Sequence, residues 1–194
     1  MQRRTLLAGA LAALVMPHHA HAKTYVLGPK GAQISYRFTV GGTPVTGTVP
    51  IKRADLSIDM TNLAGARADV TADIRQARTG MLLATEALKS RSILSAAEFP
   101  LTRFRSTQVT LGPKGRFSDG ARLHGLLTLR GVTRAVGFAA GLYRVQNTDY
   151  SDKTRLYVRL DSAIDRRDFG ALGYGELVNN TVHIAIRAQI ETTT

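Results

Sequence analysis

The segment 164–170 contains the residues of this sequence whose types are best suited to bind an anion. It reads Ile-Asp-Arg-Arg-Asp-Phe-Gly. A guanidinium presents a planar set of donors that matches a phosphate group, so Arg166 is a candidate for binding an anionic head group. Alternatively, Arg166 pairs with Asp168 and fixes the turn before Gly170. The sequence leaves both interpretations open.

Other residues that could support catalysis or metal binding are few. The sequence has no cysteine, which excludes disulfides, thiolate metal ligands and cysteine nucleophiles. Three of the five histidines lie within the first 22 residues, and only His124 and His183 follow. Two separate histidines without cysteine do not predict a metal site. No serine stands in a nucleophile elbow and no glycine-rich loop precedes a helical pattern. We therefore expect a protein that is not an enzyme and that requires no cofactor or metal.

The first 22 residues have the pattern of a secretory signal peptide. Arg3 and Arg4 precede a short apolar run over residues 5–16, and Ala20-His21-Ala22 provides small residues for cleavage. The run is shorter than the roughly 20 residues that span a bilayer. The paired arginines also fit a twin-arginine signal, so the Sec and twin-arginine routes are both open. We expect cleavage after Ala22, export to the periplasm and a single domain over 23–194.

The chain is strongly basic. Its formal net charge is +12, and loss of Arg3 and Arg4 lowers this to +10. Such a surplus suits nucleic acid, anionic lipid head groups or acidic polymers as partners. Export makes nucleic acid the least suitable of the three, so no nucleic-acid partner is expected. The part after the signal is long enough to bury a substantial core, and no linker or internal repeat divides it.

Apolar and polar residues alternate along most of the chain, as they do in strands that bury one face. The clearest run covers residues 182–190. The other expected strands lie at 34–40, 45–51, 56–60, 66–74, 100–111, 121–130, 134–145 and 155–165. Eight or nine such strands without a βαβ order predict an all-β antiparallel sandwich or barrel.

The segment 80–95 departs from this alternation. Leu83, Ala84, Ala87 and Leu88 have helical spacing, which predicts one or two short helices. A barrel of about eight strands can either be filled by its side chains or hold one small ligand. Composition does not decide between these two interiors.

Three segments resemble the YceI-like family of lipid- and polyisoprenoid-binding proteins. Residues 123–134 read Leu-His-Gly-Leu-Leu-Thr-Leu-Arg-Gly-Val-Thr-Arg, which looks like the family stretch G-x-L-T-hydrophobic-[RK]-G-V-T-[RK]. Residues 164–170 are similar to the signature I-x-R-x-D-F-G. Residues 88–107 resemble the pattern L-[KR]-S, then [YF]-P, then F-x-S-T. Together with Val178-Asn179-Asn180, these matches occur in the family order over nearly the whole chain after the signal.

Some polar positions of the family differ in this sequence. A His-Ser pair usually precedes the strand at 34–40, where this chain has Gly31-Ala32-Gln33. The usual Arg-Asp pair before the helix is replaced by Ala84-Thr85, and Val40 stands where a histidine is common. Head-group contacts made by those residues in relatives do not carry over to this chain.

The resemblance implies an extended, lipocalin-like, eight-stranded antiparallel barrel with a short helical insert near 80–95. Its apolar tunnel would take an isoprenoid chain, such as a polyprenyl phosphate or a quinone, or a fatty-acid derivative, as a ligand rather than a cofactor. Family members often pair as dimers, and some are found beside membrane cytochromes of the b561 type. A homodimer and such a membrane partner are therefore expectations by analogy.

Large apolar residues on the expected inner faces are candidates to line the tunnel: Phe38, Phe104, Leu127, Leu129, Phe138, Ile164 and Phe169. A bound lipid would gain roughly 25 cal/mol per Å² of apolar surface removed from water. The same residues could form an ordinary barrel core. Two non-catalytic functions are thus open, and a third, an enzyme that acts on a lipid inside the barrel, has no motif to support it. One is a periplasmic carrier of a long-chain isoprenoid or related lipid; the other is a solid barrel whose basic surface docks on anionic membrane, polysaccharide or a protein partner.

Overall fold

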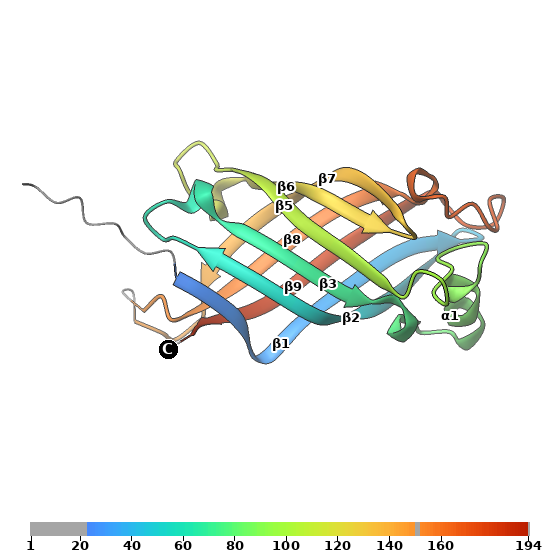
Figure 1. The fold of residues 1–194 in the computed structure, drawn as a ribbon, viewed down its shortest axis with the longest axis horizontal. Coiled ribbons are helices and arrows are strands. Elements are labelled where there is room, and N and C mark those ends of the chain that lie inside the picture. The colour runs from blue at the N-terminus through green and yellow to red at the C-terminus, as the bar shows by residue number, and fades with distance from the viewer. Residues whose placement is uncertain (1–22, 150–151, 194) are drawn as a thin grey trace, which may run out of the picture.

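The computed structural model describes residues 23–149 and 152–193. The expected signal peptide over 1–22 lies outside the described residues. The chain forms a closed, elongated antiparallel barrel with one short α-helix at one end (Figure 1). The predicted eight-stranded barrel with a helical insert is therefore confirmed.

Eight long strands make the wall of the barrel: β1 (Lys23–Val40), β2 (Thr43–Ile58), β3 (Arg67–Asp73), β5 (Leu101–Thr110), β6 (Ala121–Leu129), β7 (Val132–Arg144), β8 (Arg155–Asp165) and β9 (Thr181–Thr192). Each pairs antiparallel with the next in this order, and β9 pairs with β1 to close the ring. The two-residue strand β4 (Arg78–Thr79) pairs with β2 outside the ring.

The short helices lie at the two ends of the barrel. They are η1 (Leu63–Gly65), η2 (Ile74–Gln76), α1 (Leu82–Lys89), η3 (Phe117–Asp119) and η4 (Arg166–Phe169). In the described part of the chain, no helix is long and apolar enough to span a bilayer.

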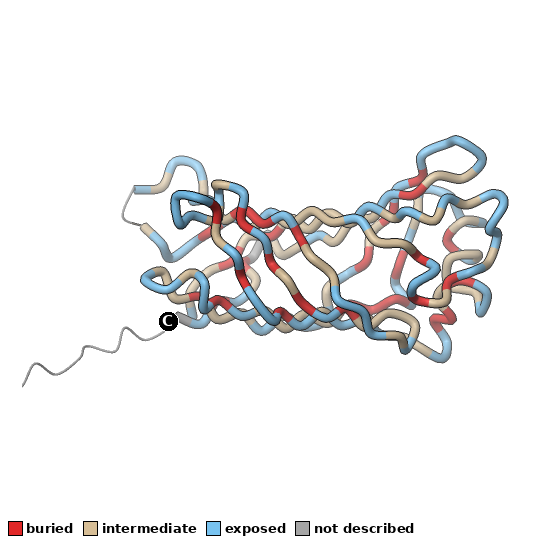
Figure 2. The backbone as a smooth tube through the Cα atoms, turned by 90° about the horizontal axis from the view of Figure 1, so that it is seen from above, coloured by how far each residue is buried: buried red, intermediate tan, exposed pale blue. Residues whose placement is uncertain are grey.

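The alternation in the sequence places one face of each strand inside the barrel. On β9, Ile184, Ile186 and Ala188 line the interior, opposite β1 residues such as Ile34. Figure 2 shows buried and exposed stretches succeeding one another along the strands. On β2 the register shifts between Ile51 and Arg53, which is a β-bulge or similar irregularity. The strand can therefore bend without turning its apolar side outward.

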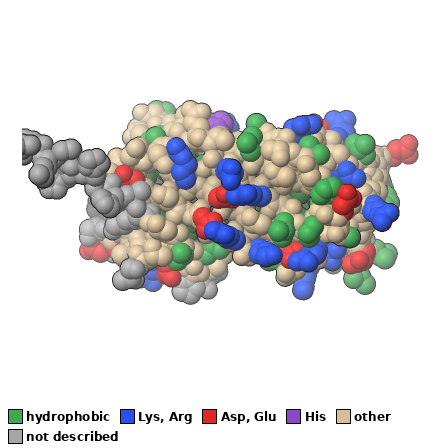
Figure 3. Space-filling model, in the orientation of Figure 1, with side chains coloured by type: hydrophobic (Ala, Val, Ile, Leu, Met, Phe, Trp, Pro, Cys, Tyr) green, Lys and Arg blue, Asp and Glu red, His purple; other side chains and the backbone are tan. Residues whose placement is uncertain are grey.

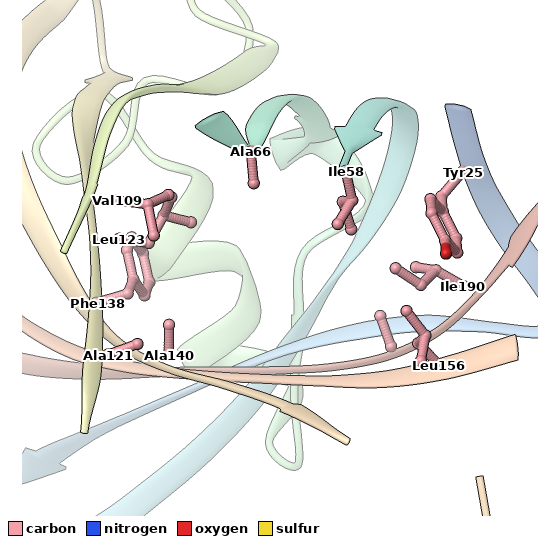
Figure 4. Close-up of a cluster of buried hydrophobic side chains, with 11 residues drawn as sticks. Tyr25, Ile58, Ala66, Val109, Ala121, Leu123, Phe138, Ala140, Leu156 and Ile190 are labelled. Carbon is pink, nitrogen blue, oxygen red and sulfur yellow. The ribbon is translucent and has the colours of Figure 1, made fainter. Parts of the chain in front are cut away.

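Two buried clusters occupy the ends of the barrel. The first lies at the end remote from α1, where Tyr25, Leu156 and Ile190 are almost completely buried (Figure 4). The hydroxyl of Tyr25 donates to the carbonyl oxygen of Lys153 over 2.9 Å, so its polar atom is satisfied. We call this end of the barrel the closed end.

The second cluster holds α1 and the segment after it against the other end of the barrel. It contains Ala72, Ile74 and Ala96, and Leu88 of α1 packs against it. Within α1, the buried Thr85 accepts a hydrogen bond from the backbone N–H of Thr79 over 2.9 Å. The helix therefore stays joined to β4 at its first turn.

Candidate functional site

The interior of the barrel is a cavity of about 850 Å³. Side chains of all eight ring strands line it, together with α1 and the loop 170–180. Aliphatic and aromatic groups dominate this lining, and a volume of this size suits a ligand larger than a few atoms. The barrel is hollow, which contradicts the alternative of a solid core.

Six of the seven predicted tunnel residues line this cavity: Phe38, Phe104, Leu127, Leu129, Phe138 and Ile164. Phe104 and Phe138 meet edge to face, with ring centroids 5.2 Å apart and planes at 79°. The ring of Phe104 lies close over Gly125 of β6, where an added Cβ would come within 2.4 Å of it. Because glycine has no Cβ, the ring of Phe104 can pack directly against the backbone of β6.

Phe169 departs from the prediction. Its side chain is only 1% exposed, yet it is not among the residues that line the cavity. The residue belongs to η4, which follows the last residue of β8. The period of two that places Ile164 inside the barrel ends with the strand, so it does not extend to a residue in a 3₁₀-helix.

Arg166 has a role that neither interpretation of its segment anticipated. Its side chain is 5% exposed and borders the cavity near α1. Nη1 donates to the carbonyl oxygens of Ala171 and Gly173, Nη2 donates to that of Val178, and Nε donates to that of Asn179. Most donors of the guanidinium are therefore engaged by the loop 170–180, which leaves little capacity for a ligand phosphate.

The ion pair of this turn is formed by Arg167 and Asp165. Arg167 Nη2 lies 2.6 Å from Asp165 Oδ2, and Asp165 also accepts from the backbone N–H of Arg167 over 2.9 Å. These hydrogen bonds hold the pKa of the Asp165 carboxyl at about 2. The ion pair of this segment is thus Asp165 with Arg167, in place of the alternative pairing of Arg166 with Asp168.

Several polar groups that border the cavity donate to backbone carbonyl oxygens. The hydroxyl of Tyr36 donates to the carbonyl oxygen of Arg78 over 2.9 Å. The hydroxyl of Thr102 donates to the carbonyl oxygen of Thr128 over 2.8 Å. Burial raises the pKa of the Tyr36 hydroxyl well above its usual range, so it stays neutral. The chamber consequently offers an apolar chain few unsatisfied polar groups.

The cavity opens at the end that carries α1, which we call the mouth. Four large apolar residues both line the cavity and are more than half exposed: Met81, Leu83, Tyr174 and Leu177. All four lie in α1, just before it, or in the loop 170–180. Sequence reasoning missed them as site residues. The sequence shows an apolar run, Met81-Leu82-Leu83, directly after Gly80, but nothing in it tells whether the run is covered or exposed.

The two histidines after residue 22 lie on strands that are not adjacent in the barrel. His124 lies on β6 and His183 on β9. Among the described residues, no group of three or more metal-ligating side chains could hold a metal ion.

The family model described as YceI-like domain matches residues 25–190. A UPF0312 protein of Vibrio parahaemolyticus is 25% identical over 190 residues, which cover 95% of this chain and 97% of the relative.

Solved structures share the same barrel. BcnA of Burkholderia cenocepacia superposes with a TM-score of 0.71 at 17% identity, covering 86% of this chain and 100% of BcnA. A polyisoprenoid binding domain from Saccharophagus degradans superposes with a TM-score of 0.60 at 13% identity, covering 89% of this chain and 100% of that domain. At these identities the likeness concerns the fold.

Proposed function

The chain belongs to the YceI-like family, and we propose that it is a non-catalytic carrier that holds a long-chain isoprenoid or related lipid inside its barrel. The lipid tail lies along the apolar chamber and the head group lies near the mouth. The carrier acts in the periplasm after its first 22 residues are removed.

The cavity is the single observation that carries this proposal. It combines a volume of about 850 Å³, a predominantly apolar lining and one mouth at which apolar lining residues are exposed. An apolar chain gains free energy along its whole length in such a chamber, because each Å² removed from water contributes roughly 25 cal/mol. No reactive side chain is needed for this gain.

The family supports the same reading at a coarser level. The solved domain from Saccharophagus degradans is described as polyisoprenoid binding, and its fold matches most of this chain. The occupied donors of Arg166 favour a ligand whose head group does not depend on a buried guanidinium. A quinone or an uncharged isoprenoid satisfies this condition more readily than a polyprenyl phosphate.

Native mass spectrometry of the protein purified from the periplasm of its own host tests the proposal. We expect a stoichiometric adduct that organic solvent extracts as an isoprenoid or acyl lipid. A clean apo mass that persists after addition of a polyprenyl phosphate, a quinone and a fatty amide would contradict it. Recovery of the protein from cytoplasm alone would contradict the proposed location.

A further inference from the structure

Six large apolar side chains project into solvent around the mouth. Met81, Leu82 and Leu83 come from the start of α1, and Leu172, Tyr174 and Leu177 come from the loop 170–180. Each is more than half exposed, and Leu82 and Leu83 reach 77% and 82%. Single exposed apolar residues are ordinary, but a group of this size around one opening marks a contact surface. We call these six residues the rim.

The two segments of the rim are fixed beside each other. The backbone N–H of Gly173 donates to the carbonyl oxygen of Ser92, in the segment after α1, over 2.8 Å. On the other side, the N–H of Gly41 donates to the carbonyl oxygen of Leu177 over 2.8 Å. Figure 1 shows α1 and this loop at the same end of the barrel. The rim is therefore one surface held on a rigid wall.

The rim is continuous with the cavity. Met81, Leu83, Tyr174 and Leu177 line the interior and face solvent, whereas Leu82 and Leu172 face solvent without lining the interior. A lipid tail that passes the rim reaches the chamber along an unbroken apolar path. At the closed end, Tyr25 and Ile190 are completely buried, and the large apolar lining residues that are exposed belong to the rim.

The charges around the rim permit contact with a lipid surface. The segments 73–100, 129–134 and 165–180 contain eight Lys and Arg against six Asp and Glu. Arg78 and Arg91 are exposed and have no ion-pair partner among the described residues, while Glu86 of α1 is paired with Lys89 at 3.5 Å. Figure 3 shows hydrophobic, basic and acidic side chains exposed together at this end. Apolar side chains bordered by cations are typical of surfaces that bind at a membrane interface.

We propose that the rim docks on the surface of a phospholipid bilayer, with Leu82 and Leu172 inserted among the lipids and the mouth facing the membrane. This rests on the proposed function, because the bilayer is the place where the lipid cargo dissolves. In the docked state the cargo moves between bilayer and chamber without crossing water. The water-exposed rim of the free protein is thereby covered during exchange.

Vesicle flotation of the full exported protein tests the docking. The vesicles are phosphatidylcholine alone and phosphatidylcholine with phosphatidylglycerol, each at low and high salt. The variant L82S/L172S alters the rim outside the cavity lining, and L126S/Y143S alters exposed apolar residues of the barrel wall as a matched control. We expect binding of the wild type to survive high salt, L82S/L172S to lower it about tenfold, and the control to stay within about twofold.

Two results would overturn the docking. Binding only to anionic vesicles, abolished by salt and unchanged in L82S/L172S, would show adsorption through the basic wall. A dimer in sedimentation experiments that L82S/L172S dissociates, without vesicle binding by either protein, would show that the rim joins two copies of the chain.

Native mass spectrometry separates this inference from the carrier proposal. Because Leu82 and Leu172 do not line the cavity, L82S/L172S loaded from detergent should retain lipid as the wild type does, while its rate of lipid uptake from vesicles falls about tenfold. A wild type that carries lipid but does not bind vesicles overturns the docking alone. Rim-dependent vesicle binding by a protein that never holds lipid overturns the carrier proposal and leaves the docking.

Discussion

Nη2 of Arg166 donates a hydrogen bond to the carbonyl oxygen of Val178 over 3.0 Å, although twelve residues separate the two in the chain. Together with the bonds to Ala171, Gly173 and Asn179, this contact ties the loop 170–180 to the end of β8. The guanidinium that was a candidate for binding an anionic head group instead fixes the loop that borders the mouth.

Replacement of this guanidinium should destabilise the fold. Arg166→Met leaves several carbonyl oxygens of the loop without their donor, and we expect it to lower the free energy of unfolding by about 2–4 kcal/mol. Arg167→Met is the matched control, since its side chain is largely exposed and its loss should matter far less. Urea unfolding followed by circular dichroism measures both. Equal effects of the two variants would show that the buried bonds of Arg166 contribute little.

Filling the chamber should displace the cargo without unfolding the barrel. Ala188 faces the cavity between Ala32 and Val158 of the neighbouring strands, so Ala188→Phe places a ring where the lipid tail would lie. Ala163→Phe adds the same ring to an exposed position on β8. We expect native mass spectrometry to find lipid in Ala163→Phe and little or none in Ala188→Phe. Full occupancy of both variants would place the lipid elsewhere.

A methyl group added beneath Phe104 should disturb the wall. At Gly125 the new Cβ would lie 2.4 Å from the Phe104 ring and 2.5 Å from the carbonyl oxygen of Arg105. We expect Gly125→Ala to cost about 1–3 kcal/mol of stability through overpacking. Gly137→Ala on the adjacent strand meets no atom closer than 3.5 Å and should be close to neutral or slightly stabilising. Thermal unfolding of the two variants checks the difference; a neutral Gly125→Ala would show that the ring moves freely.

The stability should fall in acid as Asp73 becomes protonated. Its buried carboxylate accepts hydrogen bonds from Arg75 and Gln76, and those from Arg75 hold its pKa far below the ordinary value. Because the pKa is lower in the folded state, the contribution is complete above the unfolded value of about 3.9 and is lost as pH falls below it.

Asp73→Asn provides the readout for this effect. We expect the variant to be clearly less stable than the wild type at neutral pH, and the gap in urea unfolding to narrow as the pH falls from about 5 toward 2. Asp55→Asn, in an exposed ion pair of the wall, serves as control and should change little at any pH. A gap for Asp73→Asn that stays constant with pH would contradict the assigned hydrogen bonds.

Period-two alternation predicted the strands and the inward faces of six cavity residues, whereas the choice of a barrel over a sandwich came from the family resemblance. Phe38, Phe104 and Ile164 point inward because each lies on a strand whose neighbours alternate with it. The helix at 82–89 followed from helical spacing in the same way. Such patterns report which face of an element is buried, and in this fold the buried face is also the wall of the cavity.

The contacts at the mouth could not be predicted in this way. Phe169 and Arg166 lie in a 3₁₀-helix, and the partners of Arg166 are backbone carbonyls of a loop that has no periodic pattern. A backbone acceptor carries no residue-type signal, so the sequence suggested a carboxylate or a phosphate instead. The rim was missed because apolar residues at the start of a helix or in a loop look the same in the sequence whether they are covered or exposed.

The pairing of Tyr25 with Thr192 has a practical consequence for handling the protein. It brings the first and last strands together at the closed end, so both ends of the described chain lie opposite α1 (Figure 1). A linker attached beyond Thr192 would orient the molecule on a sensor chip or bead with its opening toward the solution. The same proximity makes the barrel suitable for circular permutation, with a short peptide joining the old ends.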